Sequence, residues 1–109
     1  MKIYEFARIL GILLDNAIEA AETSKEKTIN ISFRRDDKNN RNIIFIENSY
    51  SNKEIDTETI FNKGFTEKEN HSGIGLWEVR KIVSKNNNLN LFTTKTDKLF
   101  KQQLEIYYN

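Results

Sequence analysis

The stretch HSGIGLWEVRKIV, residues 71–83, decides the fold together with ILLDNAIEAA, residues 12–21, which lies about sixty positions upstream. In the first stretch, Gly73 and Gly75 stand at the start of an amphipathic helix, where unpaired backbone N–H groups and the positive end of the helix dipole suit phosphate groups. The second stretch places Asn16 and two carboxylates on an otherwise apolar helix, and such oxygens suit a hydrated divalent cation. A phosphate site paired with a cation site indicates a nucleotide.

The composition indicates one small domain that spans residues 1–109. A chain of 109 residues with 38% apolar content can bury a single core. Seventeen basic and sixteen acidic residues give a net charge of +1, so we expect no broad surface for nucleic acid or for an anionic membrane. The absence of cysteine excludes disulfides and thiolate metal sites, and it is consistent with a reducing cytosolic setting. The longest apolar run, residues 9–14, is too short to span a membrane.

Hydrophobic spacing predicts the first helix over residues 3–22. Its polar face holds Arg8, Asp15, Glu19 and Glu22, and Asn16 lies at the border between the two faces. The predicted buried face consists of Ile3, Phe6, Leu10, Leu13, Leu14, Ala17 and Ala21. A polar residue at this border can face a cleft along the domain surface, although it can also be an ordinary solvated side chain.

Two strands are predicted to follow this helix. Residues 28–35 alternate as a half-buried strand, residues 36–40 have turn chemistry, and residues 42–48 are uniformly apolar, as in a central strand. The predicted inward-facing residues of the first strand are Ile29, Ile31 and Phe33. We therefore expect the two strands to form an antiparallel hairpin.

The second half of the chain begins with a polar stretch, residues 49–72, which contains a short helix candidate over residues 56–62. A stretch of this length in a small domain is usually a functional lid or a disordered segment. A helix over residues 73–85 and a closing hairpin of strands 89–94 and 99–108 are predicted to follow. The predicted buried residues of that helix are Leu76, Val79, Ile82 and Val83. This order predicts an α+β fold with helices on one face of a mostly antiparallel sheet.

Together with KGFTEK, these motifs resemble the ATP-binding domain of the GHKL superfamily, which includes sensor histidine kinases, DNA gyrase B and MutL. LLDNAIEAA matches the N box, whose metal-binding Asn corresponds to Asn16. Gly73, Ile74, Gly75 and Leu76 match the second glycine box. The resemblance runs from about Ala7 to the C-terminus and implies the Bergerat fold, a two-layer α/β sandwich with a mixed, mostly antiparallel sheet.

Within the superfamily, three segments most resemble the peptide-quorum sensor kinases of low-GC Gram-positive bacteria, of the accessory gene regulator and competence type. These segments are ARILGILLDNAIEAAE, IENS and FNKGFTEKENHSGIGL. The resemblance implies that the chain is a cytoplasmic fragment of a larger kinase whose parent protein lies in the cell membrane. It also implies no direct membrane contact by this fragment and no nucleic-acid partner.

The resemblance implies that ATP binds with Mg²⁺ and that Asn16 is the direct metal ligand. Glu19 is expected in a catalytic role beside metal-bound water, whereas Asp15 is more often solvent-exposed at such a position. In the predicted lid, Gly64 is expected to contact the nucleotide, and Lys68 and His71 are cations placed to meet phosphates. His71 lies in a nucleotide lid and not on a phosphoacceptor helix, so we do not expect it to be the phosphorylated residue.

Two positions depart from the superfamily pattern. Many histidine kinases carry a second Asn where this chain has Ile12, so we expect modest metal affinity. The first glycine box corresponds to IENSYSN, residues 46–52, which contains no glycine. Glu47 or Asn48 must then supply the adenine contact. We favour Asn48, whose amide can accept from the amino group and donate to a ring nitrogen, although a strand-ending Asn also often forms a local turn.

These interpretations predict the catalytic domain of a sensor histidine kinase. It would donate the γ-phosphate of Mg-ATP to a histidine on a separate dimerisation domain of the same parent protein, and a response regulator would be an indirect partner. Two alternatives share the fold. A degenerate module would signal through protein contacts, which the missing glycines of residues 46–52 favour, and an anti-sigma type kinase would phosphorylate serine.

Overall fold

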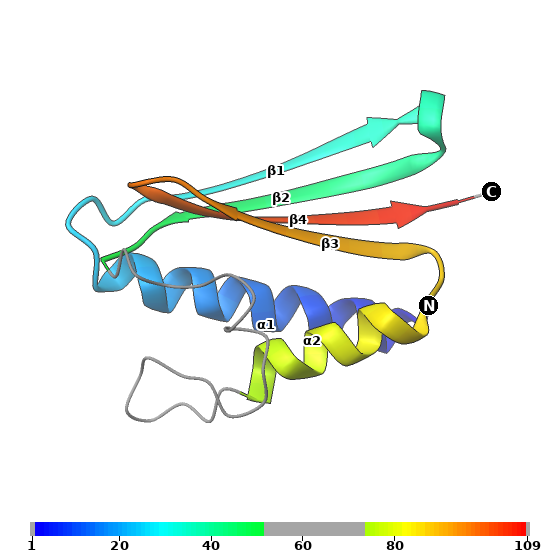
Figure 1. Ribbon diagram of the computed structural model, residues 1–109, viewed down its shortest axis with the longest axis horizontal. Coiled ribbons are helices and arrows are strands. Elements are labelled where there is room, and N and C mark those ends of the chain that lie inside the picture. Colours follow the sequence, from blue (N-terminus) through cyan, green and yellow to red (C-terminus); the bar gives the residue numbers. More distant parts are fainter. Residues whose placement is uncertain (1, 52–73, 109) are drawn as a thin grey trace.

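The structure, a computed structural model, describes residues 2–51 and 74–108 (Figure 1). The elements in chain order are α1 (Ile3–Glu22), β1 (Ile29–Asp36), the short 3-10 helix η1 (Asp37–Asn39), β2 (Arg41–Ser49), α2 (Ile74–Lys85), β3 (Leu89–Lys95) and β4 (Leu99–Tyr107). Each lies within two residues of its predicted bounds. The lid from residue 52 onward, including the helix candidate over residues 56–62, lies outside the described residues. Ser49, predicted to begin the lid, is instead the last residue of β2.

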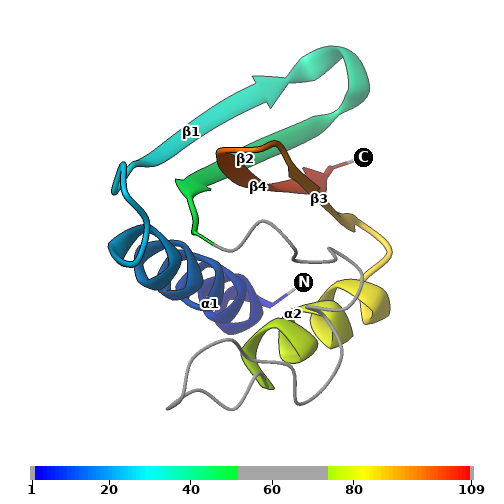
Figure 2. The same cartoon turned by 60° about the vertical axis from the view of Figure 1, so that its left-hand side comes forward.

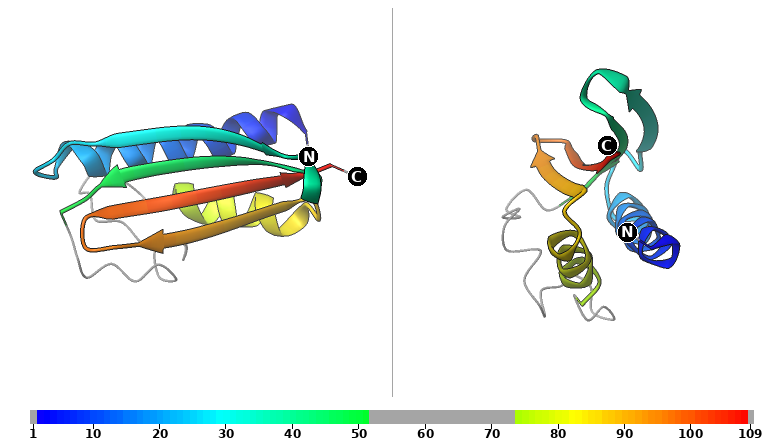
Figure 3. Two further views of the ribbon diagram at one scale, coloured as in Figure 1. Left: turned by 90° about the horizontal axis from the view of Figure 1, so that it is seen from above. Right: turned by 90° about the vertical axis from the view of Figure 1, so that its right-hand side faces the viewer.

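The four strands form one sheet in the order β1-β2-β4-β3. Both helices lie on the same face of this sheet, as the end-on view shows (Figure 3), and they lie side by side (Figure 2). The predicted two-layer α+β fold is confirmed, as are the two predicted hairpins. The predicted mixed sheet needs a correction, because every strand pairing among the described residues is antiparallel.

The hydrophobic core fills the space between the helices and the sheet. Its most buried members are Ile9, Ile12, Leu13, Ala17, Ile44, Ile46, Val79, Ile82, Leu89 and Leu104. Leu76 and Val83 pack against this core, so the predicted inner face of α2 is confirmed. The prediction for Ile3 is wrong, because its side chain is 88% exposed. At about 100° per residue, the stripe centred on Ile9 and Leu13 leaves Ile3 at its margin, on the first residue of the helix.

The prediction that Ile31 and Phe33 are half-buried is also wrong, because they are 59% and 65% exposed. They do lie on the helix-facing side, since their cross-strand partners are the core residues Ile46 and Ile44. However, β1 is an edge strand and curls away from α1 in the end-on view (Figure 3). The alternation of apolar residues in β1 therefore predicted correctly on which face of the sheet Ile31 and Phe33 lie. The twist of the sheet determined that these side chains are exposed.

A polar cluster holds the end of the sheet where β1 turns into β2. Arg41 donates Nε to Asp36 and Nη1 to Glu105, both at 2.7 Å, and Glu105 is only 3% exposed. Hydrogen bonds from Asn39 and Arg41 lower the pKa of Asp36. The turn itself uses Asn40 at φ 53°, a left-handed conformation that Asn tolerates. These contacts stabilise the hairpin tip.

Candidate functional site

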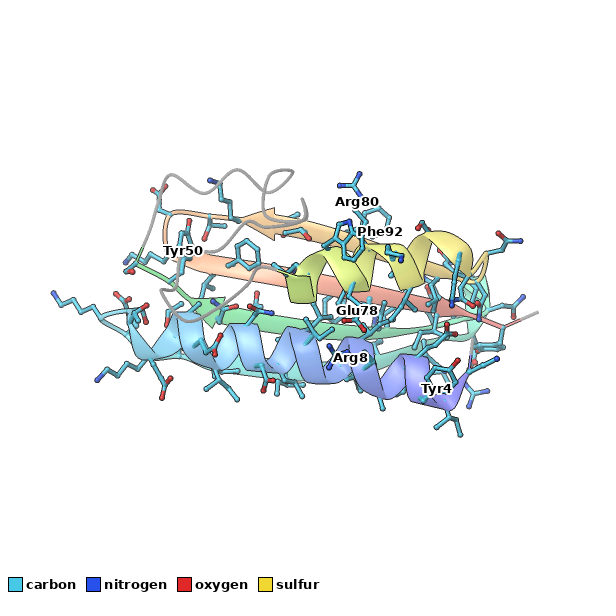
Figure 4. The ribbon with its side chains drawn as sticks, turned by 90° about the horizontal axis from the view of Figure 1, so that it is seen from below. Tyr4, Arg8, Tyr50, Glu78, Arg80 and Phe92 are labelled. Carbon is cyan, nitrogen blue, oxygen red and sulfur yellow. The ribbon has the colours of Figure 1, made fainter. Side chains whose placement is uncertain are left out.

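Two ion pairs join α1 to α2 across the helix layer. Glu5, which is 5% exposed, lies 2.8 Å from the Nζ of Lys85, the last residue of α2. Arg8 donates Nε and Nη2 to the two carboxylate oxygens of Glu78, both at 2.8 Å, and the two side chains point toward each other in Figure 4. Hydrogen bonding by Lys85 lowers the pKa of Glu5, and hydrogen bonding by Arg8 lowers the pKa of Glu78. The helices are therefore antiparallel, and later residues of α1 meet earlier residues of α2.

The next contact along this interface involves a glycine. A Cβ placed on Gly75 would lie 3.1 Å from Cγ2 of Ile12 and 4.0 Å from Nδ2 of Asn16. A glycine at this position therefore allows the first turn of α2 to approach α1 closely. The structure thus brings the two sequence motifs together, with Gly75 of one beside Asn16 of the other.

Asn16 is half-buried at the border of the helix, where the sequence predicted it. Its Nδ2 donates to the backbone carbonyl of Ile12 at 2.8 Å. Because a carbonyl only accepts, this bond decides which amide atom is nitrogen and directs Oδ1 away from the helix backbone. Ile12, which stands where many histidine kinases carry a second Asn, is a core residue, and its side chain faces Gly75.

The antiparallel arrangement also positions Glu19. Glu19 follows Arg8 and Ile12 on the same stripe of α1, eleven and seven residues later, and is half-buried, whereas Asp15 is exposed. Since the first turn of α2 lies beside Ile12, the side chains of Asn16 and Glu19 lie beyond the start of α2. The N–H groups of the first turn and the positive dipole end of α2 therefore share one region with an amide oxygen and a carboxylate.

This donor set fits a hydrated cation held together with phosphates. Among residues 2–51 and 74–108 there is no group of three or more His, Asp or Glu side chains that could hold a metal ion alone. Mg²⁺ usually retains several waters and takes few protein ligands when it binds phosphate oxygens. One amide oxygen, that of Asn16, is sufficient for such a site.

The second part of the candidate site lies at the end of β2. Asn48, 3% exposed, shares the helix-facing side with Ile44 and Ile46, whereas Glu47 lies on the opposite face. The Nδ2 of Asn48 donates to the carbonyl of Ser49 at 2.9 Å. Of the two residues proposed to contact a base, only Asn48 therefore lies in the layer that holds the helices.

Tyr50 closes this end of the sheet. Tyr50 (labelled in Figure 4) is 8% exposed. Its hydroxyl donates to the carbonyl of Thr96 in the turn between β3 and β4, and its ring packs edge-on against Phe100 with centroids 6.3 Å apart. Burial raises the pKa of Tyr50. The polar stretch predicted to begin at residue 49 thus starts with two buried residues.

The remaining predicted site residues divide into two groups. Ile74 is the first residue of α2, and Leu76 is half-buried against the core. The residues outside the described part of the chain are Gly64, Lys68, His71 and Gly73. Sequence reasoning missed the roles of Arg8 and Glu78, whose only sequence signal is opposite charge on two predicted helices seventy positions apart. No helix among the described residues is long and apolar enough to cross a membrane.

Comparisons with known proteins agree with this fold. A family model described as a GHKL domain matches residues 1–107. The histidine kinase AdeS of Acinetobacter baumannii has a similar structure, with a TM-score of 0.73 at 19% identity over 97% of this chain and 47% of that one. The catalytic domain of histidine kinase ThkA gives a TM-score of 0.73 at 25% identity, over 95% of this chain and 66% of that one.

A mycobacterial sensor histidine kinase, MprB, gives a TM-score of 0.69 at 17% identity, over 97% of this chain and 72% of that one. No curated protein sequence matches the chain. This chain spans less than two thirds of the AdeS and ThkA chains.

Proposed function

The chain belongs to the family of GHKL domains, and on this premise we propose that it is the Mg-ATP-binding catalytic domain of a two-component sensor histidine kinase. The observation that carries the proposal is the close approach of Gly75 to Ile12 and Asn16, which places the start of α2 beside an oriented amide. The motifs in residues 7–22 and 61–76 resemble those of peptide-quorum sensor kinases, and this resemblance supports a role in peptide quorum sensing. The parent protein would then lie in the cell membrane, with this domain in the cytoplasm.

In the proposed mechanism, phosphates lie at the start of α2, where backbone N–H groups donate to them. When bound, Mg²⁺ would neutralise phosphate charge, and the Oδ1 of Asn16 is the oxygen that this chain offers it. The carboxylate of Glu19 would accept hydrogen bonds from water beside the bound cation. Lys68 and His71, together with the backbone at Gly64 and Gly73, complete the proposed phosphate contacts.

The base is proposed to bind at the end of β2. The Oδ1 of Asn48 accepts a hydrogen bond from the amino group of adenine, while its Nδ2 is held by the carbonyl of Ser49. This arrangement gives Asn48 the accepting role that the resemblance assigns to a carboxylate in the first glycine box.

The acceptor of the γ-phosphate is proposed to be a histidine on the dimerisation domain of the same parent protein. Phosphoryl transfer depends mainly on positioning and charge neutralisation. The chain therefore acts by holding the triphosphate with its terminal group exposed to a partner helix. A response regulator would receive the phosphoryl group from that histidine in a later step.

Calorimetric titration with ATP, with and without Mg²⁺, tests the binding step. We expect binding that Mg²⁺ strengthens, and we expect Asn16→Ala to remove most of the Mg²⁺ effect, which corresponds to about tenfold in affinity. Asp15→Ala is the matched control, because Asp15 is the neighbouring residue and is exposed. Equal ATP affinity in the wild type and in Asn16→Ala would refute the site assignment.

A transfer assay tests the catalytic step and separates the alternatives. Mixed with the dimerisation segment of its parent protein, the chain should transfer radiolabel from ATP to a histidine there, more slowly than the joined protein does. The label should be acid-labile and unaffected by His71→Gln. Acid-stable label on a protein substrate would indicate a serine kinase. ATP binding without transfer in the intact parent would favour the degenerate module, which the missing glycines after β2 also suggest.

A further inference from the structure

Two buried serine hydroxyls meet beside the proposed base site. Ser24 follows α1 and Ser49 ends β2, and their Oγ atoms lie 2.6 Å apart. The two residues are 4% and 1% exposed. Ser49 belongs to IENSYSN, the stretch that lacks glycine, so its side chain occupies space that a glycine would leave empty.

The neighbouring bonds favour one direction for the bond between the two hydroxyls. Ser24 Oγ donates to the carbonyl of Ala21 at 2.7 Å and accepts from the backbone N–H of Lys27 at 3.0 Å. Ser49 Oγ has two acceptors within reach, Ser24 Oγ at 2.6 Å and the carbonyl of Thr28 at 3.3 Å, and the shorter contact is the better acceptor for its one proton. Ser49 Oγ in turn accepts from the N–H of Thr28 at 2.8 Å. Both protons are therefore used, and removing either hydroxyl leaves a buried group without its partner.

This network fixes the residue that orients Asn48. The N–H of Ser49 donates to the carbonyl of Thr28 at 2.9 Å, so Ser49 is held through both its backbone and its side chain. Its own carbonyl accepts from the Nδ2 of Asn48 at 2.9 Å. No hydrogen-bond donor approaches the Oδ1 of Asn48 within residues 2–51 and 74–108. The continuous path from α1 through Ser24 and Ser49 ends at the side-chain amide of Asn48.

We propose that the Ser24–Ser49 hydroxyl pair is a positioning element that makes the base site selective for a 6-amino purine. An unconstrained Asn amide can rotate and present its NH₂ group to a 6-oxo purine. With Ser49 locked, Asn48 presents Oδ1, which accepts from an amino group and repels an oxo group. This inference rests on the proposed function, because it assumes that a nucleotide base reaches Asn48.

ATP and inosine triphosphate are the probes, because inosine carries an oxo group where adenine carries an amino group. In calorimetric titrations with Mg²⁺, we expect the wild type to favour ATP by about tenfold. Ser49→Ala and Ser24→Ala should each reduce this preference to about threefold or less, mainly by weakening ATP binding. Asn48→Ala should abolish the preference. Ser84→Ala, an exposed serine of α2, is the matched control and should leave the preference unchanged.

The ratio of the two affinities distinguishes positioning from stability. The positioning role is wrong if Ser49→Ala and Ser24→Ala remain folded in a thermal melt and lower the affinities for ATP and inosine triphosphate by the same factor. It is also wrong if these folded variants change neither affinity. Two variants are used because either one breaks the same contact. Failure of the wild type to bind ATP at all would refute the proposed function, and the inference with it. Normal ATP binding with an unchanged ratio in both variants refutes the inference alone.

Discussion

The phosphate end and the base end of the proposed nucleotide site are built from different interactions. At the phosphate end, α2 rests on α1 through Gly75 and an ion pair whose side chains, Arg8 and Glu78, are 57% and 33% exposed. At the base end, hydrogen bonds between buried hydroxyls and amides hold the elements together, and Ser49 is only 1% exposed. Solvent weakens exposed charges, whereas buried hydrogen bonds are costly to break. The comparison indicates an adjustable phosphate end and a rigid base end.

The largest effect is expected from Gly75→Val, which disrupts helix packing at the phosphate end. A Cβ at this position already lies 3.1 Å from Ile12, so a branched side chain must displace α2 from α1. We expect ATP affinity to fall at least about tenfold and the free energy of unfolding to fall by about 1–3 kcal/mol. Calorimetry and denaturant unfolding measure the two effects.

Gly11→Val is the matched control for this substitution, because a Cβ on Gly11 meets no atom within 4 Å. It should leave ATP affinity unchanged and should not destabilise the chain. If both valine variants bind ATP as the wild type does, the first turn of α2 does not contact the nucleotide.

A smaller effect is expected from Tyr50→Phe, which removes a hydrogen bond at the base end. The substitution removes the hydroxyl that donates to the carbonyl of Thr96 and should cost about 1 kcal/mol of unfolding free energy. ATP affinity should fall, while affinity for tripolyphosphate, which has no base, should not change. Tyr4→Phe is the control, because Tyr4 is 65% exposed. A parallel loss of tripolyphosphate binding would show that the two ends are not separable.

The smallest effect concerns pH and should distinguish the contact between the two helices from the base end. Ion pairs with Lys85 and Arg8 lower the pKa values of Glu5 and Glu78 from their ordinary value of 4.5. A carboxylate with a lowered pKa stabilises the fold above its ordinary pKa, and this stabilisation is lost as the pH falls through the lowered value. The hydroxyls and amides of the base end do not titrate in this range.

Hydrogen exchange followed by mass spectrometry, at about pH 6.5 and about pH 3.5, measures this difference. We expect α2 to lose more protection than residues 46–49 of β2 at the lower pH, and we expect Arg8→Gln to reduce the difference. Equal loss of protection in α2 and β2 would indicate that the helix contact and the sheet respond to acid as one unit.

Sequence patterns predicted most of the fold, because residues such as Val79 and Ile82 repeat with the period of the element that contains them. Periodicity did not predict the exposure of Ile31 and Phe33, since that depends on how far the sheet edge curls away from α1. The hydrophobic pattern predicts on which face of the sheet a side chain lies, but the side chain is buried only if another element packs over that face.

The candidate site was predictable only where a motif is contiguous. Asn16 and Gly75 belong to recognisable motifs, and the structure places them together. The Ser24–Ser49 pair joins residues twenty-five positions apart that are unremarkable in sequence, and their meeting depends on how the loop after α1 joins β1. Local signals in the sequence carry no information on such a contact.

The most direct test of the two-ended site is an NMR titration that follows the side-chain amide signals of Asn16 and Asn48, assigned with Asn16→Ala and Asn48→Ala. With Mg²⁺ present, a non-hydrolysable ATP analogue should shift both signals. Tripolyphosphate should shift only that of Asn16, and adenosine only that of Asn48. An ATP analogue that binds while leaving both signals in place would contradict the account.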